Sequence, residues 1–165
     1  MRTVFIVCGL FTVLMIVLTL RVANSNRDLL RYTGKWSGGF TVDSIESGAN
    51  TESDRHRSRL EGYLQIYLTE RRYKLHLEGE QQGIDVSGNW TAKGDRITLT
   101  PKSVEIDDHG GAEKRDPNKK YIPNEEVLNT YNRPLVFIQS PDRQRYNGLP
   151  ISLGVLIGKH AFDKG

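Results

Sequence analysis

The sequence predicts an all-β domain, an antiparallel up-and-down meander of about seven or eight strands closed into a small barrel, preceded by one N-terminal transmembrane helix. Two observations predict the meander. Apolar and polar residues alternate with period two from residue 32 onward, and the first alternating runs are joined by turns of a few residues. Parallel neighbours would need crossovers of a dozen residues or more. An even number of strands permits a barrel without an open edge.

The N-terminal segment, residues 3–20, contains no charge, Asn, Gln or Pro. As a helix it would be about 27 Å long, close to the ~30 Å hydrocarbon core of a bilayer. Arg2 and Arg21 close it at both ends, where long side chains reach the headgroups. We expect a retained anchor at residues 1–21. The alternative is a signal peptide cleaved at the Ala-Asn-Ser stretch of residues 23–25.

Orientation follows from two indications that disagree. Four basic residues follow the apolar segment: Arg21, Arg27, Arg31 and Lys35. By the positive-inside rule they would keep the domain in the cytoplasm. A two-residue tail, one helix and a β-rich domain are instead typical of an exported, anchored protein. We predict a single-pass membrane protein with its domain on the extracytoplasmic side, joined by a linker at residues 22–31.

Cysteine usage and charge exclude several classes. The sole cysteine, Cys8, lies inside the apolar segment, which argues against a lipoprotein signal and excludes a disulfide framework. Arg2 and Arg21 account for two of the 23 Lys and Arg residues, so the remaining chain has 21 against 20 Asp and Glu. A net charge near +1 gives no basis for a nucleic-acid surface, and we expect no nucleic-acid partner.

The strand pattern is clearest in the first hundred residues. The alternating runs are residues 34–42, 60–68, 73–77, 84–92 and 96–101, with a polar loop at 43–58 after the first. In each run the larger apolar residues share one face. The expected inward-facing set is Trp36, Phe40, Leu64, Leu68, Tyr73, Leu75, Trp90 and Leu99. Glycines at 38, 62 and 88 fall on the same face and would leave room beside these side chains.

A long polar loop at residues 102–133 is expected next. Val104 and Ile106 continue or resume the preceding strand within it. Asn124 is expected to cap a short helix that reaches about Tyr131, with acidic residues in its first turn. A connection of this length is either mobile or functional.

Two apolar runs, residues 135–139 and 151–158, are predicted as the closing strands. The segment 141–150 between them is expected to be a turn. The β-barrel domain then spans residues 32–165, a length sufficient for one hydrophobic core.

Two glycine-x-tryptophan units, Gly34-Lys35-Trp36 and Gly88-Asn89-Trp90, recur in this domain. The stretches YTGKWSGGF and GNWTAKGDRITLTP that contain them resemble the lipocalin-like barrels of bacterial envelope proteins, including the N-terminal domain of copper-resistance lipoproteins. In that family a Gly-x-Trp strand, a Gly-Asp turn and an Ile-x-Leu strand recur. The resemblance implies a lipocalin-like barrel. The family's lipidated cysteine and Cys-x-x-Cys pair are missing here, so copper handling and redox sensing are not implied.

Motifs for chemistry are sparse. The four histidines occur singly, without a His or Cys partner at ligand spacing, and no metal or cofactor is expected. There is no Gly-x-Ser-x-Gly and no cysteine outside the apolar segment, so acyl transfer has no nucleophile. The adjacent carboxylates Asp107 and Asp108 lie in a polar loop, which is a weak basis for acid–base catalysis. We predict that the protein is not an enzyme.

The leading hypothesis is a membrane-anchored, lipocalin-like binding module of the cell envelope. Its partner is either a small apolar ligand inside the barrel, against Trp36, Phe40, Tyr73 and Trp90, or another envelope protein. The outward-facing Tyr63 and Tyr67 would suit a protein contact. The alternative is a structural or assembly protein with a filled barrel. An enzyme with residues 102–133 as a lid is the third hypothesis.

Overall fold

The computed structural model describes residues 12–17, 19, 29–45, 60–79, 82–109, 122–153 and 156–165. The chain divides into two compact units, Met1–Tyr32 and Thr33–Gly165. In the first unit residues 12–17 are helical with exposed side chains. The hydroxyl of Thr19 donates to the carbonyl oxygen of Met15 at 2.7 Å, a contact typical of one helical turn.

Across the described part of the chain, no helix combines the length and the apolar character needed to span a bilayer. Most of the predicted anchor at residues 3–20 and of the linker at 22–31 lies outside the described residues. The transmembrane helix therefore stays a prediction.

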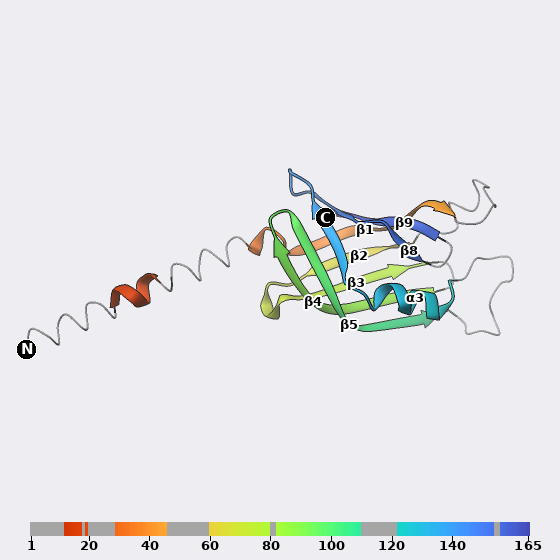
Figure 1. Cartoon of the computed structure of the whole chain (residues 1–165), viewed down its shortest axis with the longest axis horizontal. Helices are drawn as coiled ribbons and strands as arrows, with labels where there is room; N and C mark the ends of the chain where they lie inside the picture. The colour runs from red at the N-terminus through yellow and green to blue at the C-terminus, as the bar shows by residue number, and fades with distance from the viewer. Residues whose placement is uncertain are drawn as a thin grey trace, which may run out of the picture. The chain divides into compact units, whose positions relative to one another are not determined.

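The second unit is a closed antiparallel barrel (Figure 1). Its elements are β1 (Gly34–Ile45), β2 (Leu60–Ile66), the 3-10 turn η1 (Thr69–Arg71), β3 (Arg72–Glu78), β4 (Gln82–Lys93), β5 (Arg96–Asp108), α3 (Asn124–Tyr131), β6 (Leu135–Gln139), β7 (Arg145–Gly148), β8 (Ile151–Leu153) and β9 (Leu156–Lys164). Neighbours run in the order β1-β2-β3-β4-β5-β6-β7-β9, and β9 pairs with β1 to close the ring. The predicted all-β antiparallel barrel is confirmed.

The alternation of apolar and polar residues in the sequence corresponds to the inner and outer faces of the barrel wall. In β3, Tyr73, Leu75 and Leu77 are buried, while Arg72 and Lys74 are exposed. The same side-chain period in the neighbouring strands places their apolar residues on the inner face. Burial of this inner face is the main source of stability for the barrel.

Large side chains fill the interior. The largest fully buried ones are Trp36, Trp90, Tyr73, Tyr131, Tyr146, Phe40, Phe137 and Phe162. The rings of Trp36 and Tyr146 meet edge to face with centroids 4.5 Å apart. A Cβ at Gly38 would overlap the carbonyl oxygen of Ala161, so the room expected beside this glycine is occupied by the neighbouring strand. The interior is packed by the chain's own side chains.

Two predictions for the C-terminal part were wrong. Residues 151–158 are not one strand, because β8 ends at Leu153 and β9 continues to Lys164. The predicted turn at 141–150 contains the strand β7. It was missed because it is only four residues long and its outward-facing residues are polar, whereas Tyr146 and Gly148 face inward. β7 and β8 both pair with β9, at its two ends, so together they act as one strand interrupted at Leu149 and Pro150. Proline lacks the N–H that a ladder needs.

Other boundaries also shift. Residues 102–108 of the predicted loop belong to β5 and pair with β4. Asn124 lies inside α3, whose cap position is Pro123, and its amide donates to Asp108 at 3.4 Å. Leu68 lies after the end of β2 and is half-buried instead of facing the core.

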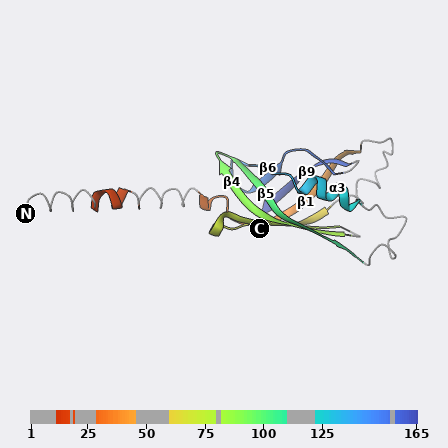
Figure 2. The same cartoon turned by 60° about the horizontal axis from the view of Figure 1, so that its bottom comes forward.

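The helix α3 covers an opening in the barrel wall. β5 pairs with β6 only through its first four residues, Arg96 to Leu99. Beyond that point α3 lies against β5 and β8, as Figures 1 and 2 show. Its Val127 and Tyr131 are fully buried, and the hydroxyl of Thr130 donates to a β8 carbonyl at 2.7 Å. The helix thus closes the side of the barrel that the sheet leaves open.

Candidate binding site

The four predicted ligand residues, Trp36, Phe40, Tyr73 and Trp90, lie inside the barrel on β1, β3 and β4. Each is 2% exposed or less. They pack as parts of the core, and the indole N–H of Trp90 donates to the carbonyl oxygen of Tyr67 at 2.8 Å. Among the described residues, Trp36 Nε1 and the Tyr73 hydroxyl have no hydrogen-bond partner. Burial raises the pKa of Tyr73 above its ordinary value.

A β-bulge on the outer wall is the starting point of a different site. Ser87 opposes Ser103 and Gly88 opposes Pro101, so Lys102 is an extra residue without a partner in β4. A Cβ at position 88 would overlap the carbonyl oxygen of Thr100, so this close approach requires glycine. Bulges bend the strand and redirect a side chain. Here the bend displays Lys102 on the outside.

The η1 turn forms the opposite wall. Glu70 and Arg71 adopt φ values of 55° and 49°, the left-handed region that non-glycine residues seldom occupy. Such a conformation persists only where its surroundings hold it. The amide of Asn89 donates to the carbonyl oxygen of Glu70 at 3.0 Å, and Trp90 holds Tyr67 as described. The Gly88-Asn89-Trp90 unit therefore shapes one wall and fixes the other.

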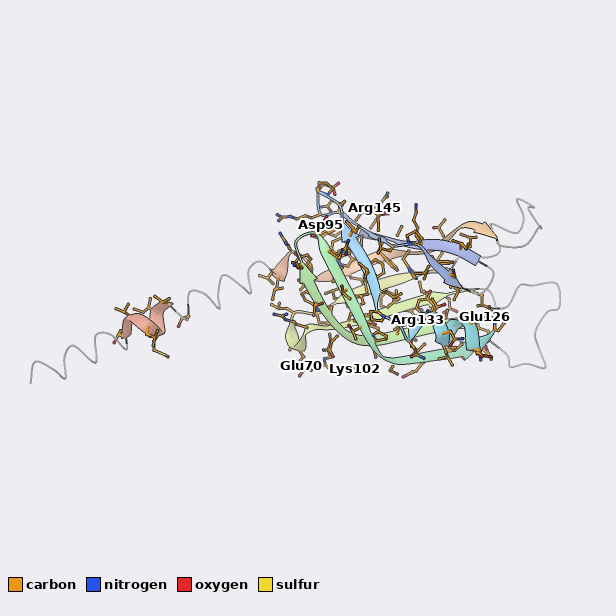
Figure 3. All side chains as sticks on the ribbon, in the orientation of Figure 1. Glu70, Asp95, Lys102, Glu126, Arg133 and Arg145 are labelled. Carbon is orange, nitrogen blue, oxygen red and sulfur yellow. The ribbon has the colours of Figure 1, made fainter. Side chains whose placement is uncertain are left out.

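Between these walls lies a groove of about 440 Å³. Three of its nine lining residues are basic and none is acidic, and the basic ones are Arg72, Lys74 and Lys102. Thr69, Ser87 and Asn89 add hydroxyl and amide groups. The ring of Tyr67, 46% exposed, lies at the same groove. Figure 3 shows Lys102 and Glu70 on one side of the barrel.

Ion pairs compensate only two of the three cations. Arg72 Nε lies 2.9 Å from a Glu70 oxygen, and Lys74 Nζ lies 3.3 Å from Asp85. The hydrogen bond and the charge of Asp85 raise the pKa of Lys74 above its ordinary value. Lys102 is exposed and has no ion pair or hydrogen bond to any described residue. We call these residues and their lining neighbours the bulge groove.

Two histidines outside the bulge groove contact carboxylates of the barrel itself. His76 Nδ1 lies 3.1 Å from Asp85, and His109 contacts Glu78 on the outer surface. Within the described residues no group of three or more His, Cys, Asp or Glu side chains is arranged to hold a metal ion. His56, in the polar loop at residues 43–58, lies outside the described residues.

A buried pair lies beneath α3. The Tyr131 hydroxyl and His160 Nε2 are 3.0 Å apart, and both residues are at most 1% exposed. Burial lowers the pKa of His160 from 6.5 to about 3 and raises that of Tyr131 above its ordinary value. Phe40, Phe137 and Phe162 surround the imidazole at centroid distances of 5.4 to 6.0 Å. The ring is therefore neutral and sealed from solvent.

The sequence indicated only part of the bulge groove. Tyr67 was predicted on the outer face. Lys102 was assigned to a loop, and its meeting with Arg72 depends on the register of three strands. The sequence does carry a signal of the bulge. The apolar residues of β5 stand at odd positions before Lys102 and at even positions after it, as in Leu99 and Val104, and a one-residue bulge produces this change of phase.

No protein-family profile matches this chain, and no curated protein does. Among solved structures, the chain is similar to a streptavidin-like protein from Bacteroides eggerthii DSM 20697. The two chains are 11% identical, the match covers 79% of this chain and 81% of the other, and the TM-score is 0.39. This likeness concerns the fold alone.

Proposed function

We propose that this protein is a non-enzymatic binding module, tethered to a membrane by residues 3–20, that holds its ligand on the outer wall of the barrel in the bulge groove. The observation that carries the proposal is the contrast between the two faces of the wall. The inner face is filled by aromatic and aliphatic side chains, whereas the outer wall has a groove at which Lys102 has no ion pair with any described residue.

The large side chains buried in the barrel favour a ligand on the outer wall over an apolar ligand in the interior. An eight-stranded barrel either fills with its own side chains or holds one small molecule. A ligand beside Trp36 would have to displace Tyr146, whose ring lies 4.5 Å away. Displacing a packed ring costs several kcal/mol of core contacts. Surface binding has no such cost.

A structural or assembly role for a filled barrel is the second candidate, because it too needs no internal cavity. The two candidates differ at the bulge groove. A spacer has no need of a lysine that a bulge displays at a groove, whereas a binding module does.

We also propose that the domain lies on the extracytoplasmic side of the membrane, because an apolar helix followed by a β-rich domain is typical of an exported, anchored protein.

The test uses the full chain in a neutral detergent and a thermal-shift panel of soluble metabolites and lipids. Ser87→Trp fills the groove from its exposed rim, and Phe137→Leu loosens the core on a strand that does not line the groove. Every compound that stabilises the wild type should lose its effect in S87W and keep it in F137L.

The opposite pattern would place the ligand inside the barrel and overturn the proposal. A panel with no stabilising compound would favour the spacer. Circular dichroism of both variants controls for their folding.

A further inference from the structure

We propose that the bulge groove is a phosphate site, in which Lys102 and Arg72 bind the phosphoryl oxygens and Tyr67 lies against the group that the phosphate is attached to. This inference rests on the proposed function, since it names the ligand class of the same groove.

Lys102 carries the inference furthest. The bulge displays its ammonium at the groove, and no described carboxylate pairs with it. An ammonium is a compact charge with three donors, and phosphate is among the strongest acceptors that it meets. A lysine held in this way is ready to bind an anion without first breaking an ion pair.

Arg72 and Lys74 supply the second source of positive charge. Their partners, Glu70 and Asp85, do not line the groove. Both pairs are exposed, with side chains between 39% and 65% accessible, and such surface pairs contribute little to stability. Arg72 can therefore exchange Glu70 for a phosphate, with which its planar guanidinium forms two parallel hydrogen bonds. With both carboxylates counted, the three cations still leave one positive charge.

The arrangement of donors favours phosphate over carboxylate. Candidate donors come from four elements: Thr69 on η1, Arg72 on β3, Ser87 on β4 and Lys102 on β5. A carboxylate has two oxygens in one plane. A tetrahedral phosphate presents three or more oxygens in different directions, which suits donors that surround it.

The size of the groove leaves room for a ligand larger than the free ion. About 440 Å³ is within the range of sites for small organic molecules. Tyr67 lies at the same groove with almost half of its surface exposed. A sugar, glycerol or ring attached to the phosphate would lie against it. The ligand class is thus a phosphate ester, from either a lipid headgroup or a soluble metabolite.

The lipid source has one structural argument. β1 begins at the end of the barrel that carries η1, because Gly34 pairs with Ile66 and Ile66 pairs with Tyr73. The chain that precedes β1 therefore joins the barrel at the end that carries η1 and the bulge groove, and we include a lipid probe in the test for this reason.

The test is isothermal titration calorimetry on the full chain in a neutral detergent. The probes are sn-glycerol 3-phosphate, phosphatidylglycerol in mixed micelles, and glycerol as the uncharged control. Lys102→Gln removes the groove charge. Lys93→Gln is the matched control, because Lys93 is also exposed but lies at the end of β4, outside the lining.

We expect at least one phosphate probe to bind, and K102Q to weaken that binding about tenfold, the usual effect of removing one charge-assisted hydrogen bond. K93Q should stay within about twofold of the wild type, consistent with its position outside the site. Raising the salt from about 0.05 M to about 0.5 M should weaken binding in the wild type, because salt screens the cations.

The pattern of binding distinguishes the two sources. Binding of phosphatidylglycerol alone identifies a lipid headgroup, and binding of glycerol 3-phosphate as well identifies a soluble ester. Equal loss in K102Q and K93Q, or no binding of either phosphate probe, would overturn the phosphate site. If neither phosphate probe binds but other compounds lose their thermal shift in S87W, the proposed function stands while the phosphate inference fails. Unchanged melting curves show that both lysine variants are folded.

Discussion

Among the places where the barrel departs from a regular ladder, the opening beside β6 and the bulge at Lys102 differ in what occupies them. Beyond Leu99, β5 loses its partner β6, and α3 fills the opening with Val127 and Tyr131. Near the bulge, the pairing of β3 with β4 ends at Arg72 and Asn89, and a groove remains. The first opening has become core and the second has stayed open to solvent.

The two places differ in the chemistry of the side chains that line them. At the α3 gap the polar groups are matched, since the Tyr131 hydroxyl meets His160 Nε2 and three phenylalanines exclude water. At the bulge groove the lining carries three cations and no carboxylate. A defect closed by matched groups contributes to stability, whereas one lined by charge is free to bind. The predictions below test this contrast.

Tyr131→Ala should have the largest effect, because it removes the ring that fills the α3 gap and leaves His160 without its partner. We expect the free energy of unfolding to fall by about 3–5 kcal/mol, as for other buried aromatic residues. Urea denaturation followed by circular dichroism measures it. Leu128→Ala on the same helix is the control, since Leu128 is 37% exposed and should cost much less. Equal losses in the two variants would show that α3 does not fill the wall.

Gly88→Ala should lower the free energy of unfolding by about 1–3 kcal/mol, the usual cost of forcing atoms into a packed site. The added Cβ would overlap the carbonyl oxygen of Thr100 and push the bulge open. Thermal melting measures this loss. The neighbouring Ser87→Ala, on an exposed side chain, should change little. A neutral G88A would mean that the bulge is not held by this close contact.

Acid should destabilise the barrel through His160. Its pKa is about 3 in the folded protein and about 6.5 when unfolded, so the unfolded state binds the extra proton as the pH falls. Stability from the neutral ring is complete above pH 6.5 and declines toward pH 3, by up to about 1.4 kcal/mol per pH unit. Urea midpoints between these pH values measure the slope. His160→Phe, which cannot titrate, should flatten it, and an unchanged slope would assign the effect to other groups.

Lys102→Gln should have the smallest effect on stability. The side chain is exposed and has no described partner, so the free energy of unfolding should change by less than about 0.5 kcal/mol. The measurement is the same urea titration. A large loss would mean that Lys102 serves the fold, and the bulge groove would then resemble the α3 gap.

Local periodicity was enough to predict several elements. The bounds 135–139 of β6 were read from the sequence, and the helix ending at Tyr131 was expected. Features that depend on register or on distant pairing were missed. β7 is short and outwardly polar, and Tyr131 meets His160 across 29 residues of sequence. The Lys102 bulge was missed although the alternation of β5 records it, because the apolar residues change from odd to even positions across Lys102.

The two tryptophans of the chain give the protein its own optical reporters. Trp90 is hydrogen-bonded to the backbone of Tyr67 beside the bulge groove, whereas Trp36 lies against Tyr146 in the barrel body. Because indole fluorescence depends on its surroundings, Trp90 reports movement of the η1 turn, and Trp36 reports the integrity of the ring of strands. With Trp36→Phe, emission would come from a single buried indole hydrogen-bonded to the groove residue Tyr67, so that a displacement of Tyr67 would be read without any added dye.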